Sequence, residues 1–294
     1  FLGRDTARPG AAIPLARPDF SGAAADLGVT WFGHSSVLIE IDGYRVLADP
    51  VWSERCSPSQ TVGPRRMHPV PAGLDTRPAL DAVIISHDHY DHLDVETIWS
   101  LARTQRCSFF VPLGVGAHLR HWGIAPERIV ELDWDGEGAV GELRIVCTPA
   151  RHFSGRFLTR NTTLWSSWAM IGPRHRAFFG GDTGYTGSFA DIGEAHGPFD
   201  LTLMPVGAYH PGWPDIHMNP EEAVRAHLDV TDAGRGVFVP IHWATFRLAP
   251  HPWSEPVERL LAAARPAGVT VVVPMPGAQV RPGSVDLEDD WWQL

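Results

Sequence analysis

One stretch of nine residues, SHDHYDHLD (86–94), constrains this chain more than any other. It holds three histidines and three aspartates and comes directly after an apolar run, AVII. His87 and His89 lie two apart, so in extended backbone both imidazoles project to the same side. Asp91 and His92 follow after a turn, and we predict that the first pair binds one metal ion and the second pair another. A polar surface loop without a ligand role is the alternative.

A metal site needs ligands from elsewhere in the chain, because a catalytic zinc ion has about three protein ligands and one open position. Three residues stand where an apolar strand would aim them: His152 after LRIVCTPAR, Asp182 after RAFFGG and His242 after GVFVPI. We predict His152 as the third ligand of the first metal and His242 as that of the second, with Asp182 bridging both. A single strand-end histidine is more often a hydrogen-bonded loop residue, but the combined pattern favours the metal interpretation.

The order of elements predicts an α/β protein. Asp42-Gly43 is a typical hairpin turn, and helices are expected over 95–103 after Asp94, from Pro220 after Asn219, and over 255–268. Further strands are expected over 81–86, 108–112, 143–150, 176–181, 201–206, 236–241 and 270–274. The strands divide near residue 145, which predicts one domain (29–294) of two similar halves, preceded by an extended arm (1–28).

Composition excludes several classes of protein. The net charge of −10 over 294 residues disfavours a nuclease or another nucleic-acid partner. No apolar run approaches the roughly 18 residues of a membrane span. The three cysteines are widely spaced, which indicates no disulfide framework and favours a reducing compartment. We expect a cytoplasmic protein and leave open peripheral membrane contact, a homo-oligomer and, since the chain begins with Phe1, a removed signal segment.

The pattern His-x-His-x-Asp-His with strand-end His, Asp and His resembles the metallo-β-lactamase superfamily. This resemblance implies an αβ/βα four-layer sandwich with a dinuclear metal site on one edge. The segments WFGHSSVLIEIDGYRVLADP, GAYHPGWPDIHMNPEEAV and IHWATFRLAPHPWSEP are further similar to the N-acylphosphatidylethanolamine-hydrolysing phospholipase D family and its bacterial relatives. They imply a phosphodiesterase with two Zn²⁺ per chain, acting on a phosphodiester or an N-acylated phospholipid.

Two metal ions can share a water, lower its pKa and clamp an anionic oxygen of the substrate. We therefore expect a bridging hydroxide as nucleophile, Asp182 holding both metals, and Asp91 orienting the hydroxide or accepting its proton. The resemblance implies that Asp49, in LADP, supports the ligand loop by hydrogen bonding; a plain turn before a proline is the alternative. His34, in GHSS, has the same two interpretations.

Substrate contacts are expected from His217, before a helix N-terminus in DIHMNPEE, and from Gln60 in SPSQTVGPRR. The resemblance implies that His217 lies over the metals and binds phosphate; a helix-capping role is the alternative. Ile216 replaces the glutamine that family members carry, which puts the same lipid substrate in doubt. Arg65 and Arg66, in the same segment as Gln60, are expected to be an exposed basic pair; a contact of one of them with phosphate is the alternative. The alternative functions are a lactonase or small phosphodiesterase resembling the ascorbate-phosphate lactonases, and an iron-dependent redox enzyme.

Overall fold

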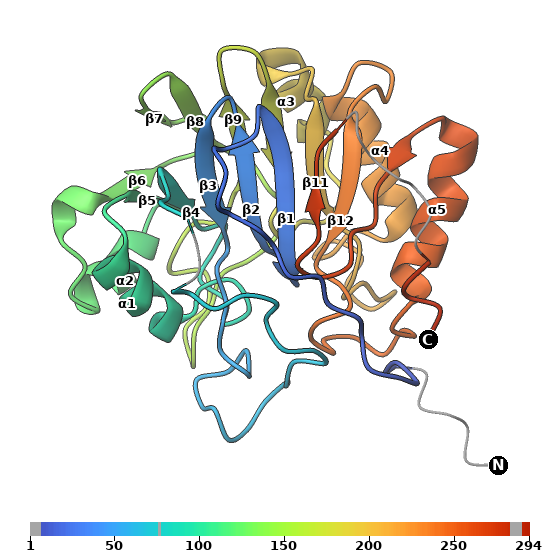
Figure 1. Cartoon of the computed structure of the whole chain (residues 1–294), viewed down its shortest axis with the longest axis horizontal. Coiled ribbons are helices and arrows are strands. Elements are labelled where there is room, and N and C mark those ends of the chain that lie inside the picture. Colours follow the sequence, from blue (N-terminus) through green and yellow to red (C-terminus); the bar gives the residue numbers. More distant parts are fainter. Residues whose placement is uncertain (1–6, 76–77, 283–289) are drawn as a thin grey trace.

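The computed structural model describes residues 7–75, 78–282 and 290–294. Two mixed seven-stranded sheets face each other (Figure 1). The first has the order β14 (Gln279–Val280), β1 (Leu27–Gly33), β2 (Ser36–Ile41), β3 (Tyr44–Ala48), β4 (Ala82–Ile84), β5 (Ser108–Pro112) and β6 (Ile129–Leu132). The second has the order β13 (Thr270–Val271), β12 (Val237–Ile241), β11 (Leu201–Pro205), β10 (Arg176–Phe179), β9 (Ser167–Ile171), β8 (Leu143–Thr148) and β7 (Glu137–Val140).

Helices cover the outer face of each sheet, which gives four layers. They are α1 (Val95–Thr104), α2 (Val115–His121), α3 (Ser188–His196), α4 (Pro220–Val230) and α5 (Glu255–Ala267), with a short 3₁₀ helix at Pro126–Arg128. Strand β2 shows how alternation builds the layers: Val37 and Ile39 join the core between the sheets, whereas Leu38 packs with the core under α1 and α2. This is the αβ/βα sandwich that the sequence predicted.

The helix boundaries follow from local signals that the sequence displays. Asn219 and Glu222 form a complete capping box at the start of α4, and Gly268 ends α5 in the left-handed conformation. At the start of α1 the side chain of Asp94 does not cap the helix. It accepts hydrogen bonds from the backbone N–H groups of Trp52 and Ser53, and so holds the loop that follows β3.

The division into halves near residue 145 was only approximately right. Strand β7 already belongs to the second sheet, and β14 returns from the far end of the chain to pair with β1 in the first. The described part of the N-terminal arm lies on the body: Ile13 is buried, and the Ala16 N–H donates to the carbonyl of Pro276.

All three cysteines are free and buried. Among the described residues, none of the helices combines the length and apolarity needed to cross a membrane.

Candidate metal centre

The predicted ligands come together at one edge of the sandwich because each follows the end of a strand. The loop 86–94 follows β4, and His152, Asp182 and His242 follow β8, β10 and β12. Close packing of these segments requires Gly181, which has φ +58°; a Cβ there would lie 2.6 Å from the Cβ of Ser86. The folding of the sheets thus brings residues 150 positions apart in sequence to one site.

The first group contains the side chains of His87, His89, His152 and Asp182, whose candidate ligand atoms lie within 4.8 Å of one another. His89 Nδ1 lies 2.8 Å from His87 Nε2 and 3.3 Å from His152 Nε2. Asp182 Oδ2 lies 3.9 Å from His87 Nε2 and 3.7 Å from His152 Nε2. Three imidazoles and one carboxylate therefore converge on one point.

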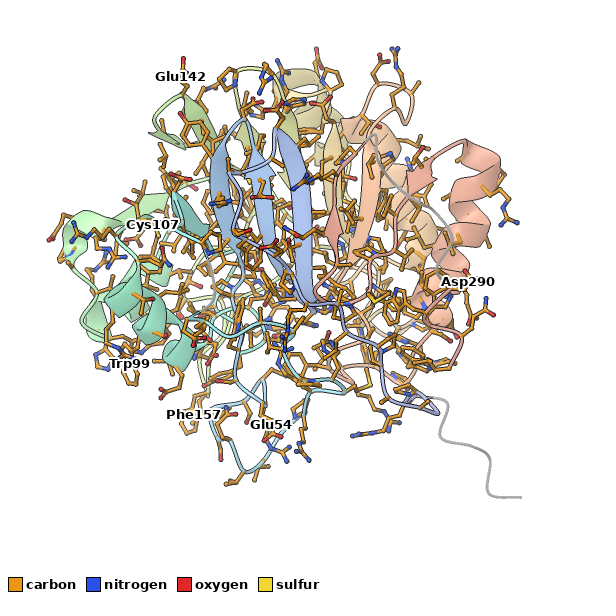
Figure 2. The ribbon with its side chains drawn as sticks, in the orientation of Figure 1. Glu54, Trp99, Cys107, Glu142, Phe157 and Asp290 are labelled. Carbon is orange, nitrogen blue, oxygen red and sulfur yellow. The ribbon has the colours of Figure 1, made fainter. Side chains whose placement is uncertain are left out.

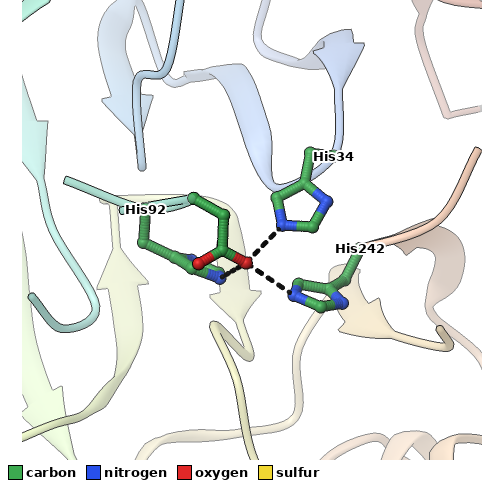
Figure 3. A group of neighbouring side chains, drawn as sticks. His34, His92 and His242 are labelled. Carbon is green, nitrogen blue, oxygen red and sulfur yellow. Dashed lines mark hydrogen bonds and ion pairs between the residues drawn. The ribbon is translucent and has the colours of Figure 1, made fainter. Parts of the chain in front are cut away.

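The second group contains His34, Asp91, His92 and His242 (Figure 3). Asp91 Oδ2 lies 3.4 Å from both His92 Nε2 and His242 Nε2. Asp182 reaches this group as well, with Oδ2 3.1 Å from His92 Nε2 and Oδ1 3.1 Å from His242 Nε2. One carboxylate thus contacts both groups, which is the arrangement predicted for a bridging ligand.

The donor set fits divalent cations. His92 Nε2, His242 Nε2 and Asp182 Oδ1 are buried and make no hydrogen bond in the described structure. Buried polar atoms without partners are unfavourable, so their convergence calls for a ligand between them. Imidazole nitrogens with carboxylate oxygens are the usual donors to zinc and related metals.

The electrostatics of the chain alone also call for positive charge between the carboxylates. Burial by itself would raise the pKa of Asp182, but the imidazoles of His242 and His92 hold it well below its ordinary value. Burial by itself would lower the pKa of His242, yet Asp182 raises it to about 9. His92 shows the same balance, with Asp182 and Asp91 holding its pKa well above the ordinary value. In the chain without metal, protons on the imidazoles of His92 and His242 therefore supply the positive charge that metal cations would bring.

Asp49 is fully buried beneath the second group. It accepts hydrogen bonds from the backbone N–H of Ser86 at 2.7 Å and from its hydroxyl at 2.6 Å. His92 Nδ1 lies 2.6 Å from the same carboxylate, so the Nδ1 proton points to Asp49 and Nε2 faces the centre. Metal-binding histidines are commonly oriented in this way, by a carboxylate that accepts the proton of the ring nitrogen facing away from the metal.

His34 lies against Asp91, with Nε2 2.8 Å from Oδ2. Burial lowers the pKa of His34 to about 3, so the ring is neutral and donates its Nε2 proton to Asp91. The backbone of His34 has φ +53° and donates its N–H to the Thr245 hydroxyl oxygen at 2.6 Å. That hydroxyl also bonds His68 Nε2 at 3.0 Å. Thr245 and His68, which support His34 in this way, were not predicted as site residues. Thr245 could have been noticed only through the segment IHWATF, which is similar to the phospholipase D family.

His217 lies at the margin of both groups. Its Nδ1 is 3.9 Å from Asp182 Oδ2, and its ring centroid is 5.1 Å from that of His242. Burial lowers the pKa of His217 to about 4, so the ring is neutral at physiological pH. Because the capping box of α4 is complete without it, capping does not account for its position.

The 53–66 loop differs from expectation at two positions. Gln60 is exposed, and its amide exchanges hydrogen bonds with the backbone N–H and carbonyl of Arg55 at 3.0 and 3.1 Å. Its side chain is thus engaged away from the two groups. Arg65 is exposed and pairs with Glu54. Arg66, expected to be exposed, is buried and donates to the carbonyls of Val51 and Ser53, so that expectation was wrong.

The sandwich and its His/Asp cluster define a metal-dependent hydrolase. The chain belongs to the metallo-β-lactamase superfamily, since residues 44–243 match the beta-lactamase superfamily domain. It is 67% identical to an uncharacterised protein of Mycobacterium tuberculosis, over 98% of this chain and 77% of that one. It is 40% identical to N-acyl-phosphatidylethanolamine-hydrolyzing phospholipase D 1 of Caenorhabditis elegans, over 75% of this chain and 64% of the relative. A metallo hydrolase from Ignicoccus hospitalis shares the fold, with TM-score 0.64 and 25% identity over 86% of this chain and 97% of that one.

Proposed function

We propose that this chain is a dinuclear zinc phosphodiesterase whose substrate is a glycerophospholipid of the N-acylated kind. The observation that carries the proposal is the Asp182 carboxylate, which lies between two groups of imidazole and carboxylate ligands. The similarity to the nematode phospholipase D supports the substrate class, as does that to the mitochondrial N-acyl-phosphatidylethanolamine-hydrolyzing phospholipase D of Saccharomyces cerevisiae, which is 32% identical over 84% of this chain and 54% of the relative.

The residues of the chain have separate tasks in this reaction. Two zinc ions would lower the pKa of the attacking water and neutralise the charge of the phosphoryl oxygens. His87, His89 and His152 would hold one ion, Asp91, His92 and His242 the other, and Asp182 both. Asp91 remains ionised, since its pKa lies well below the ordinary value despite burial. The hydrogen bond from His34 fixes its carboxylate, which can then orient the water or accept its proton.

Two exposed apolar side chains support contact with a lipid surface. Phe157 and Leu158 are 83% and 87% exposed and lie in the loop that follows His152. Phe157 has φ +55°, an uncommon conformation for a bulky residue. In Figure 2 Phe157 extends from the same end of the molecule as Glu54. Glu54 lies in the 53–66 loop, which also carries Val62, a side chain that is 70% exposed. Apolar tips at this end would place the metal centre near the head groups of a membrane.

A substrate panel tests the proposal directly. The zinc-loaded protein should hydrolyse phosphodiesters faster than phosphomonoesters, lactones or β-lactams, and should contain about two zinc ions per chain. A faster lactone reaction would favour the lactonase alternative. Full activity with one redox-active iron per chain would contradict the dinuclear hydrolase.

We predict that His217→Ala leaves the metal content unchanged and lowers kcat/KM for a phosphodiester by about ten- to a hundredfold. The lost hydrogen bond to a charged phosphate corresponds to roughly 1.5–3 kcal/mol. Kinetics with soluble diesters, together with elemental analysis, measure both quantities. Loss of a metal ion would instead identify His217 as a ligand, and a lower melting temperature with unchanged kcat/KM would leave it a structural role.

We predict that the double variant Phe157→Asp, Leu158→Asp loses most hydrolysis of phospholipid in vesicles but keeps its rate on a soluble chromogenic diester. Charged side chains at the loop tip would not enter the interface, whereas the metal centre is untouched. Vesicle co-sedimentation measures binding separately from turnover. Leu294→Asp, at another exposed leucine, is the matched control. Equal losses on both substrates would show that the loop acts on the centre rather than on the membrane.

A further inference from the structure

One arginine side chain contacts the ligand loop 86–94 at three places. Arg156 lies between β8 and β9, and its Nη1 donates hydrogen bonds to the carbonyls of Asp88 at 2.8 Å and Leu93 at 2.7 Å. The central carbon of its guanidinium lies 4.0 Å from the centre of the Tyr90 ring, a typical cation–π contact. The same side chain therefore binds the loop near its beginning, its middle and its end.

Asp88 makes a second connection with its own side chain. This carboxylate is fully buried, and its Oδ1 accepts the N–H of Gly155 at 2.6 Å. Its Oδ2 lies 3.2 Å from Nε2 of His118 on α2. The ligand loop and the residue pair Gly155 and Arg156 are thus bound to each other in both directions. We call these contacts between Asp88 and the residue pair the Asp88–Arg156 clasp.

The clasp joins the two segments that supply the histidines of the first ligand group. The ligand loop carries His87 and His89. His152 lies four positions before Arg156, in the segment on the other side of the clasp. The clasp is therefore placed to fix these three imidazoles relative to one another.

Two of these histidines have hydrogen bonds of their own that orient the ring. His87 Nδ1 lies 2.9 Å from the hydroxyl of Ser86. His152 Nδ1 lies 2.9 Å from the carbonyl of Ile216. The His89 imidazole has hydrogen-bond contacts only at Nδ1, which faces the other two rings, and within the described part of the chain its Nε2 has none. His89 thus lacks the usual partner behind a metal-binding histidine.

The position of His89 is consequently set by its neighbours. Its ring packs edge-on against Phe153, with the ring centroids 4.5 Å apart. In sequence it stands between Asp88 and Tyr90, and both of these residues contact Arg156. The backbone that carries His89 is therefore held on both sides by one guanidinium.

The second ligand group has separate supports. Asp49 accepts the Nδ1 proton of His92. His34 donates to the carboxylate of Asp91. Neither contact involves the clasp, so the second group keeps these supports when the clasp is removed.

We propose that Arg156 is a positioning residue that fixes His89 and thereby sets the affinity of the first group for its metal ion. The inference rests on the proposed dinuclear centre. A planar guanidinium suits this task, because it can donate to carbonyls and lie on an aromatic ring at the same time. A side chain that only stabilised the fold would support both groups equally, so the difference between the two groups separates these roles.

Zinc titration of Arg156→Ala tests the inference. We expect this variant to bind one ion as tightly as the unmodified protein and the other about ten- to a hundredfold more weakly, the usual loss when a group behind a metal ligand is removed. Arg151→Ala is the matched control, because it removes a guanidinium next to His152 that pairs with Asp215 rather than with the ligand loop. Both of its zinc affinities should be unchanged.

Cobalt identifies which of the two ions is weakened, because the visible absorption of Co²⁺ depends on its ligands and their geometry. With one equivalent of Co²⁺, Arg156→Ala should give the spectrum of His89→Ala, which lacks a ligand of the first group. It should differ from His242→Ala, which lacks a ligand of the second. Arg156→Lys keeps the charge without the planar group and should show an intermediate zinc affinity. It carries the same comparison if Arg156→Ala does not fold.

Equal weakening of both ions, or two unchanged affinities, in a folded Arg156 variant would overturn the inference and leave the proposed function standing. So would a cobalt spectrum that matches His242→Ala. An unmodified protein that binds two ions but hydrolyses no phosphodiester would overturn the proposed function alone. A single bound ion in the unmodified protein would overturn both.

Discussion

Asp182→Asn should lower kcat/KM by at least about a hundredfold and release at least one of two bound metal ions. Removing a group that only hydrogen-bonds a metal ligand already lowers metal affinity or activity by about ten- to a hundredfold, and the loss of a ligand itself should be no smaller. The carboxylate lies 3.1 Å from imidazoles of His92 and His242 and within 4 Å of the first group. An amide keeps the shape of the side chain but has neither the charge nor the second anionic oxygen needed to hold two cations. Elemental analysis and steady-state kinetics measure the two effects.

The fold should survive this change, because Asp182 is held among imidazoles rather than in the apolar core. Circular dichroism of Asp182→Asn should therefore match that of the unmodified protein. Asp191→Asn, at an exposed position on α3, is the control that makes the same chemical change without effect on metal content. Unchanged turnover and metal content in Asp182→Asn would show that this residue does not bridge the two groups.

The approach of the predicted ligands could be foreseen because it depends on local rules. A short loop with alternating histidines fixes which side chains face one way, and a residue at the end of an apolar strand is aimed by the sheet. His87, His89 and His152 come together in this way. The start of α4 at Pro220 was also readable from its capping box, and the end of α5 from Gly268, since such signals act within one turn.

The features that sequence reasoning missed depend on distant contacts. Strand β14 is two residues long and exists through pairing of Val29 with Val280, which no local pattern indicates. The positive φ of His34 depends on a hydrogen bond to Thr245, 211 positions away. Arg66 looked exposed because arginine usually is, but carbonyls of the loop that follows β3 take up its guanidinium.

Metal removal should abolish activity and change how stability depends on pH. In chelated protein, the carboxylates around His242 raise its pKa to about 9, and His92 is raised as well, whereas unfolded histidine has about 6.5. The folded apoprotein therefore binds more protons than the unfolded chain between these values, and its stability falls as pH rises through this window. Zinc competes with these protons, so its affinity should rise over the same range.

We therefore expect the gap in melting temperature between zinc-loaded and chelated protein to widen as pH rises from about 6.5 to about 8.5. Calorimetric titration of apoprotein near neutral pH should detect protons released on zinc binding, through the dependence of the heat on the ionisation enthalpy of the buffer. His227→Gln is a control, because this buried histidine lies in α4 and belongs to neither group of candidate ligands. A constant gap and no proton release would contradict ligation through His92 and His242, since both must lose their protons before they bind a cation.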